Sequence, residues 1–181
     1  NSNIIITKIE VWRTNIGSAV TNNRNLVAFA DLGESKPYGQ NPMIEFPGVS
    51  NLPDQYLSNQ LLHIVDVNAI RDINSVSPYL QAMGFVSGQN YEKIESARKL
   101  SSSEFTFNPK LGFISLNQAL AADQVLAVAF RYQIVGDTTL YQVGEFSDEG
   151  IADPNTLVVK LLKSSSLNVR NPMWKLMMKN V

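Results

Sequence analysis

Short runs of alternating apolar and polar residues recur at both ends of the chain, and they constrain its fold more than any other feature. Residues 4–14 read IIITKIEVWRT and residues 26–32 read LVAFADL, with apolar side chains at a period of two. The pattern returns in β-hairpins over residues 105–146, and residues 157–162 are one more strand or the start of a buried segment. Such runs are typical of β-strands joined by turns, and they predict a mainly antiparallel sheet or sandwich.

The segment between the two halves begins with a stretch that excludes regular structure. Residues 33–53 contain four prolines and three glycines, and proline lacks the N–H that a helix interior or a central strand requires. We therefore expect a long surface loop over these residues. The link at residues 15–25 is rich in Asn, Gly, Ser and Thr, a composition that also indicates a loop.

Helical signals predominate in residues 54–100. Asp54 is a suitable N-cap for a first short helix, whose leucines fall on one stripe. Ser77 before Pro78 has the order expected at the start of a second helix, and Gly84 is a typical stop signal.

Residues 91–100 favour a third helix, because Tyr91, Ile94 and Ala97 are spaced three apart and a Glu-Lys pair is spaced four apart. Asn171 followed by Pro172 predicts a last short helix. The predicted fold class is therefore α+β. It is a mainly antiparallel β-sheet or sandwich with a helical insertion around residues 54–100 and a short C-terminal helix.

Composition limits both the architecture and the chemistry. A chain of 181 residues fits a single domain over residues 1–181. Its 15 Lys and Arg against 16 Asp and Glu give a net charge of −1, which argues against nucleic-acid binding. With no Cys and one His, disulfides, thiol catalysis and multi-His metal sites are excluded. No signal peptide and no apolar run long enough to span a membrane can be recognised.

His63 is the only histidine, and it lies between apolar neighbours in the run LLHIV. A partly buried structural role is favoured over a catalytic one, because a useful base needs a partner. Asp66 is near it in sequence, but this proximity alone specifies no reaction.

Two acidic groups are candidates for calcium binding. Asp31 and Glu34 end a strand, and carboxylate oxygens are the ligands that Ca²⁺ prefers. Their spacing does not match an EF-hand loop, so a charged strand end with a turn glycine is the favoured interpretation. The second group is favoured as a solvated turn, and it consists of Glu145, Asp148, Glu149 and Asp153. We therefore assign no catalytic, cofactor-binding or metal-binding residue.

The last 26 residues carry basic side chains and no acidic ones. The cations are Lys160, Lys163, Arg170, Lys175 and Lys179, and the apolar neighbours are Met173, Trp174, Met177 and Met178. A basic amphipathic helix of this kind suggests a membrane-surface segment, but so short an apolar face favours a helix that packs on the sheet.

Several segments together resemble the SprA family, called Sov in some members. The matching stretches cover nearly the whole chain in order, and they are residues 7–15, 24–34, 91–100, 107–116, 125–132, 141–146 and 174–181. The closing WKLMMKNV is the most distinctive of them. The resemblance is silent over the Pro-rich loop and over residues 60–89.

This resemblance implies a part of a very large outer-membrane protein that forms the translocon of the type IX secretion system. The implied function is a non-enzymatic structural one, in support of protein export to the cell surface and gliding motility. The implied partners are the remainder of the same large barrel protein, other secretion components and exported proteins. Helices and a Pro-rich loop interrupt the strands, unlike the regular strands of a membrane barrel wall. We therefore expect a soluble domain, without direct membrane insertion, on the extracellular rather than the periplasmic face.

A rival interpretation comes from another class of protein. A cell-surface β-sandwich that binds carbohydrate or peptide would use exposed aromatic side chains, and Trp12, Tyr38 and Tyr56 are the candidates. This reading weakens if Trp12 is buried. A hydrolase is disfavoured, because the supply of His, Cys and paired acids is poor.

Four side chains are predicted to lie in the core, namely Trp12, Phe29, Val128 and Phe130. The C-terminal region, residues 157–181, is expected to contain one more strand and then a junction. We expect residues 172–181 to be this junction to the rest of a longer protein, because they hold five apolar residues in six positions.

Overall fold

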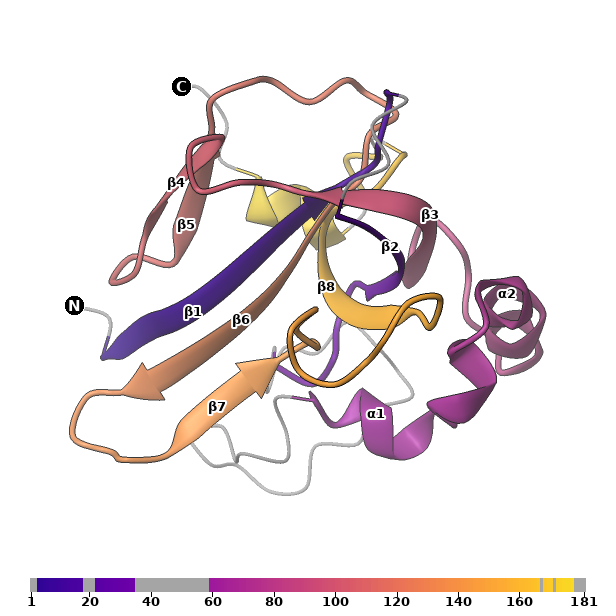
Figure 1. The fold of residues 1–181 in the computed structure, drawn as a ribbon, viewed down its shortest axis with the longest axis horizontal. Coiled ribbons are helices and arrows are strands. Elements are labelled where there is room, and N and C mark those ends of the chain that lie inside the picture. The colour runs from indigo at the N-terminus through magenta and orange to yellow at the C-terminus, as the bar shows by residue number, and fades with distance from the viewer. Residues whose placement is uncertain (1–2, 18–21, 35–58, 167, 171, 178–181) are drawn as a thin grey trace.

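The computed structural model describes residues 3–17, 22–34, 59–166, 168–170 and 172–177. Its main element is a sheet of six strands in the order β1-β3-β2-β8-β6-β7 (Figure 1). These strands are β1 (Ile4–Arg13), β2 (Asn23–Phe29), β3 (Tyr91–Lys99), β6 (Leu126–Ile134), β7 (Leu140–Val143) and β8 (Leu157–Lys163). A separate hairpin is formed by β4 (Phe105–Asn108) and β5 (Phe113–Leu116).

The sheet closes on itself, so the predicted sandwich is wrong and the predicted β-rich α+β class is right. β1 pairs with β6 from Ile4 to Arg13, and with β3 only at Trp12 and Arg13. Because β1 pairs with both β3 and β6, the strands β1, β3, β2, β8 and β6 form a closed five-stranded barrel. All pairings in the barrel are antiparallel except that between β2 and β8.

The barrel interior is filled by apolar side chains from all five strands. The inward-facing cluster contains Trp12, Leu26, Ala28, Ile94, Ala97, Ala127, Ala129, Leu157, Val159 and Leu161. Small alanines on β2, β3 and β6 face larger residues on β1 and β8, which lets a narrow barrel close around a solid core.

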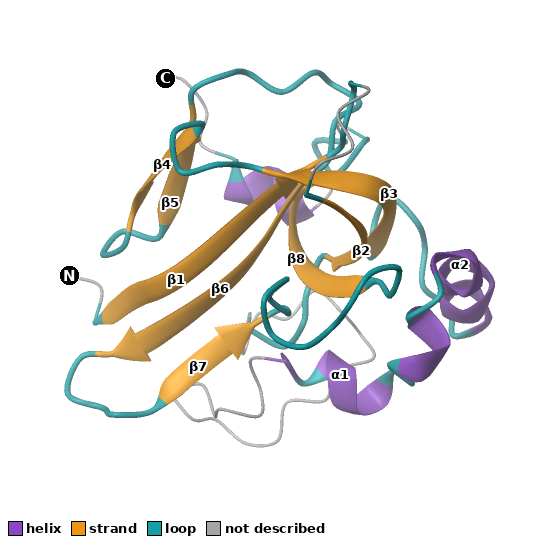
Figure 2. Cartoon of the chain, viewed as in Figure 1, coloured by secondary structure: helices purple, strands orange, loops and turns teal. Residues whose placement is uncertain are grey.

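Two further apolar clusters cover the outside of the barrel, and Figure 2 shows the elements that bury them. One side is covered by α1 (Leu61–Ile64), the 3-10 turn η2 (Asn68–Ile70) and α2 (Ile73–Ala82), which pack on Phe29 and Tyr91. On another side the β4–β5 hairpin packs against Val11 and Val128. An apolar outer surface of the barrel would be unfavourable in water, so both outer clusters are covered by these elements.

The helical insertion is shorter than predicted, because residues 91–99 form strand β3. Tyr91 and Ile94 lie on opposite faces of this strand, whereas the spacing of three between Ile94 and Ala97 arises from a β-bulge: β2 passes from Arg24 to Leu26 while β3 passes from Ala97 to Ile94. Ser96, within the bulge, has a φ of 51°. The extra residue puts Ile94 and Ala97 on the same inward face, a spacing that resembles a helix in sequence.

Helix α2 also begins earlier than predicted. Asp72 is its N-cap, and its side chain accepts a hydrogen bond of 3.0 Å from the N–H of Asn74, so Pro78 lies inside the helix rather than at its start. The predicted stop is confirmed, since Gly84 has a φ of 88°. The predicted cap at Asp54 lies outside the described residues.

Three of the four predicted core residues are buried. Trp12, Phe29 and Val128 are at most 3% exposed, whereas Phe130 is only partly buried, between the two outer clusters. The prediction for Phe130 is corrected because its side chain lies on the outside of the barrel, where the packed elements bury it only in part.

The chain closes both ends of the barrel. The 3-10 helix η3 (Pro172–Leu176) follows β8, and its Met173 is 4% exposed within the interior cluster. At the other end, the plug segment (residues 144–156) folds back between β7 and β8 and inserts Phe146, which is fully buried in the same cluster.

Candidate functional site

The plug segment is held at the barrel end by cations from two neighbouring strands. Lys8 of β1 and Arg131 of β6 are partners in the β-ladder, and both lie over the Phe146 ring. The Lys8 Nζ is 4.0 Å and the Arg131 Cζ is 5.3 Å from the ring centroid. Such cation–π contacts stabilise a positive charge over the negative face of an aromatic ring, and here they position the plug.

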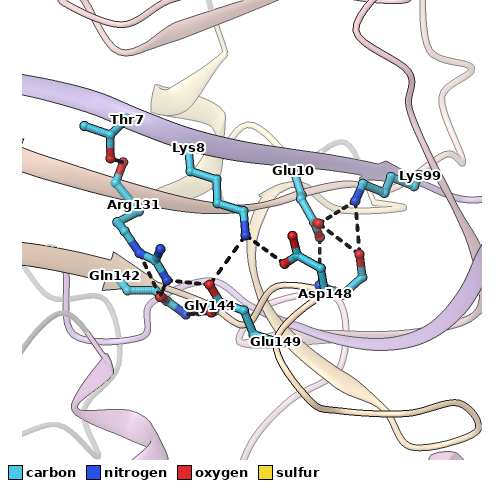
Figure 3. A network of polar contacts seen from close by, with 10 residues as sticks. Thr7, Lys8, Glu10, Lys99, Arg131, Gln142, Gly144, Asp148 and Glu149 are labelled. Atoms are coloured by element: carbon cyan, nitrogen blue, oxygen red, sulfur yellow. Dashed lines mark hydrogen bonds and ion pairs between the residues drawn. The ribbon is translucent and has the colours of Figure 1, made fainter.

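Two carboxylates of the plug pair with the same cations, as Figure 3 shows. Lys8 donates to Asp148 at 2.7 Å and more distantly to Glu149 at 3.4 Å, while Arg131 donates to Glu149. The Gln142 amide accepts from the Arg131 Nε at 3.2 Å and donates to Glu149 at 3.2 Å. The result is a chain of charge-assisted hydrogen bonds across the barrel end.

These contacts shift the pKa values of the paired groups toward the charged forms. The hydrogen bond from Lys8 lowers the pKa of Asp148. Burial alone would raise the pKa of Glu149, but hydrogen bonds from Arg131 and Gln142 outweigh it and lower this pKa. Burial also opposes the charge on Lys8, yet the bond to Asp148 raises the pKa of Lys8. Lys8, Asp148 and Glu149 therefore stay ionised at neutral pH.

The inner part of the network is more deeply buried. Glu10 has a side chain only 3% exposed, and it forms an ion pair with Lys99 of β3. The backbone N–H and the hydroxyl of Ser147 both donate to Glu10, at 3.0 and 2.9 Å. This places one buried carboxylate where it binds the plug and β3 together.

A second set of contacts fixes the far side of the plug. Arg71, after η2, makes a bidentate pair with Glu145 at 2.7 and 2.6 Å and donates to the carbonyl of Thr156 at 2.7 Å. Arg24 of β2 donates to the carbonyl oxygens of Ile151 and Asn155. The acidic run is solvated in part, as expected, since the side chains of Asp148 and Asp153 are 61% and 68% exposed. All four of its carboxylates nevertheless pair with a basic side chain from another element.

The charges of this network balance. Lys8, Lys99 and Arg131 contribute three positive charges, and Glu10, Asp148 and Glu149 contribute three negative ones. A neutral, mutually hydrogen-bonded set of this kind can hold a segment in place, whereas it has no unpaired base or nucleophile to offer a substrate. In sequence, one signal marks it: Lys8, Glu10 and Trp12 alternate onto a single face of β1, which puts charged groups in line with an inward Trp.

The other proposed calcium position already holds a cation of the protein. Asp31 is 1% exposed and accepts from the N–H of Gly33 at 2.9 Å, as a strand-end turn requires. Glu34 forms an ion pair with the buried Lys160, which also donates to the carbonyl of Ala30. Burial raises the pKa of Glu34 despite the opposing charge of Lys160. An ammonium group therefore occupies the place that a calcium ion would take.

His63 is exposed on α1 rather than partly buried, because Leu61 and Val65 take the buried positions of this short helix. Asp66 is also exposed, and its carboxylate accepts from the N–H of Asn68 at 3.0 Å. Within the described ranges, no three His, Asp or Glu side chains gather into a group that could bind a metal ion.

The basic C-terminal run does not form one surface. Lys160 and Lys163 belong to β8 and are buried, and Lys163 donates to carbonyl oxygens of Ala122, Gln124 and Ser164. Burial lowers the pKa of Lys163. Arg170 is exposed, whereas the side chain of Lys175 and all of Lys179 lie outside the described part. None of the helices in the described part is long and apolar enough to cross a membrane.

The fold and site thus define a filled, five-stranded barrel whose ends are closed by its own chain. No protein-family model matches this chain, and no curated protein is similar to it.

Proposed function

We propose that this chain is a non-enzymatic structural domain of a very large outer-membrane protein related to the type IX secretion translocon. In this role it supports protein export to the cell surface and gliding motility. The single observation that supports a structural role is the plug. Six charged side chains from β1, β3, β6 and the plug are used to close the barrel end rather than to form an open site.

The link to the translocon rests on where the resembling segments fall. Residues 7–15, 24–34, 91–100 and 125–132 coincide with β1, β2, β3 and β6, which are four of the five barrel strands. Residues 107–116 form most of the β4–β5 hairpin, and residues 141–146 lead into the plug. The resembling segments thus lie on the framework of the fold, which supports a structural role.

In this proposal the domain is attached to the export channel and does not form the passage itself. Its interior is filled by Trp12, Phe146 and Leu161, which are at most 1% exposed, so no chain can thread through it. Its partners are the rest of its own large protein, other secretion components and the exported proteins, and its place is the extracellular face.

Binding of carbohydrate or peptide through a sheet of aromatic side chains is less well supported. Trp12 is 1% exposed inside the barrel and cannot contact a ligand. The other two aromatic candidates, Tyr38 and Tyr56, lie outside the described residues.

The experiment is an in-frame deletion of residues 3–177 from the complete gene in the native cell. We expect secreted proteins to accumulate inside the cell envelope and gliding to stop, while a matched Arg170→Gln variant exports normally because Arg170 is exposed. Normal export and gliding by the deletion strain, with the truncated protein present in the outer membrane, would contradict the proposal.

A second measurement tests the face on which the domain lies. Leu111, in the turn between β4 and β5, is 69% exposed, so a peptide tag inserted there will not disturb the barrel. We expect antibody to bind the tag on intact cells. Binding only after the outer membrane is permeabilised would place the domain in the periplasm.

A further inference from the structure

A pocket of about 130 Å³ lies where the β4–β5 hairpin meets the rim of the barrel. Arg13 ends β1 and Leu100 follows β3 on the barrel side, while Leu116 ends β5 on the hairpin side. The polar lining comes from Ser103, Glu104, Asn117 and Gln118. The pocket is therefore part apolar and part polar, with one cation in its wall.

Arg13 is the cation, and its position sets it beside a second arginine. Arg13 and Arg98 are directly opposite each other in the antiparallel pairing of β1 and β3. Like charges at such positions repel, so one shared carboxylate would be expected to lie between them. Glu104 is the acid in the pocket lining, but its carboxylate pairs with Arg98 and not with Arg13.

Glu104 is fully engaged by other donors. Both of its oxygens accept from the Arg98 guanidinium, at 2.9 and 2.6 Å. The N–H and the hydroxyl of Ser101 donate to the same carboxylate, at 2.9 and 3.0 Å. The hydrogen bond from Arg98 and that from the Ser101 N–H lower the pKa of Glu104 to about 2, so this acid remains ionised and committed to Arg98.

Arg13 is left with hydrogen-bonding capacity and a charge. Its Nε is buried without a hydrogen-bond partner, and its guanidinium forms no ion pair with the residues that the structure describes. Arg13, Arg98 and Glu104 together carry a net charge of +1. Arg13 is partly buried, and a buried N–H that lacks an acceptor is costly, so a ligand oxygen at the Nε would relieve this cost.

We propose that this pocket binds a carboxylate group carried on a short aliphatic stem. The carboxylate accepts from the Arg13 guanidinium, in the planar geometry that arginine and carboxylates share. The stem packs on Leu100 and Leu116, and the exposed Gln118 amide stands at the rim as a further donor. This binding activity is separate from the structural role proposed above.

Size and charge favour this class of ligand over others. A cavity of about 150 Å³ holds a ring as small as benzene, so the present pocket suits a group of a few heavy atoms. A monoanion balances the net charge of +1, whereas a phosphate dianion would face the Glu104 carboxylate in the wall with only one free cation to offset it. The same chemistry is available from a free short-chain acid or from a Glu side chain of a peptide.

The test is a titration of the isotope-labelled 181-residue chain with sodium propionate at low salt, followed by NMR of the lining residues. We expect saturable shifts with a dissociation constant of about 1 mM, because one charged contact and a small apolar surface give only a few kcal/mol. Propionamide has the same shape without the charge and should bind at least about tenfold more weakly. Equal binding of propionamide, or no saturation below about 100 mM propionate, would overturn the proposal.

Two variants connect the binding to Arg13. Arg13→Gln should weaken propionate binding about tenfold or more, while the matched Arg170→Gln leaves it unchanged. Ser103→Glu is a second variant on an exposed position, so the fold is kept while a negative charge is added at the pocket. It should also abolish binding. Retained affinity in either pocket variant would contradict the proposal.

A further arm distinguishes the two sources of the carboxylate. The capped peptide Gly-Glu-Gly is compared with capped Gly-Gln-Gly under the same conditions. Tighter binding of the Glu peptide than of propionate assigns the pocket to a protein partner, and binding of propionate alone assigns it to a free acid. Failure of both probes would overturn the proposal.

Discussion

Glu10 and Lys99 form an ion pair between β1 and β3 in which the acid is much more deeply buried than the base. The side chain of Glu10 is 3% exposed and that of Lys99 is 35% exposed. Burial of this kind makes the carboxylate dependent on its donors, which are Lys99 and the two groups of Ser147.

Removing Lys99 should therefore destabilise the fold more than removing a cation whose acid partner is exposed, as Asp148 beside Lys8 is. We expect Lys99→Met to lower the free energy of unfolding by about 2 kcal/mol, below the 3–5 kcal/mol of a fully buried pair because Ser147 still donates. Lys8→Met is the matched control, and its more exposed pair should cost less than about 1 kcal/mol. Urea unfolding of both variants measures the difference, and equal losses would show that the depth of Glu10 has no energetic consequence.

Phe146 should be the aromatic residue on which the plug depends. Its side chain is fully buried in the barrel interior, so Phe146→Ala should cost about 3–5 kcal/mol. Phe130→Ala removes the same atoms from a partly buried position and should cost clearly less. The comparison needs only the denaturation midpoints of the two variants, and a larger loss for Phe130 would place the plug outside the core.

Gly144 begins the plug at a point where no side chain fits. Its φ is 76°, and an added Cβ would lie 3.2 Å from the Val158 carbonyl oxygen and 3.3 Å from the Ala129 Cβ. Gly144→Ala should thus combine a backbone strain of about 1–2 kcal/mol with an overpacking cost of about 1–3 kcal/mol. Gly136→Ala is the control, since that glycine has a φ of 93° in open space and should show the strain alone. Thermal melts measure the difference, and a larger drop in melting temperature for Gly136→Ala than for Gly144→Ala would contradict the close approach of Val158 and Ala129 to Gly144.

Glu104 should contribute a pH-dependent part of the stability. Its pKa is lowered from 4.5 to about 2 in the folded chain, chiefly by the hydrogen bond from Arg98. A lowered acid pKa stabilises the fold above the unfolded value, so this contribution is complete above about pH 4.5 and is lost as the pH falls toward 2. Glu104→Gln should flatten the stability curve between those values. Urea midpoints measured across this range test it, and an unchanged slope in the variant would show that Glu104 is not the responsible group.

Much of the framework could be predicted from local pattern. The strands at residues 4–14 and 125–134 lie where apolar, β-branched runs predict them, and residues 157–162 form the strand that was one of two expectations there. The hairpin around Pro109 lies where alternation predicts it. These predictions succeed because such runs report directly on which side chains must leave water. The turn at Gly84 was equally clear, since a positive φ favours glycine.

The predictions that were wrong depend on contacts between parts of the chain that are distant in the sequence. Residues 91–99 look helical partly because a bulge at Ser96 puts Ile94 and Ala97, three residues apart, on one face, and only the pairing with β2 determines the bulge. The candidate sites were affected in the same way. The acids of the plug are visible in the sequence, but their partners are not. Lys8 and Arg71 are 140 and 74 residues away from the acids that they bind, and Arg131, on β6, is 18 residues away from Glu149.

The sequence by itself determined that the chain is β-rich, which residues alternate into its core, and where its turns and acidic runs lie. The tertiary structure alone decided that the sheet closes, that the acidic run plugs the barrel, and that Glu104 pairs with Arg98 and leaves Arg13 free. The physical reason is that alternation and turn chemistry act over a few residues, whereas closure and ion pairing depend on which distant strands become neighbours. That choice is made by the packing of the whole core.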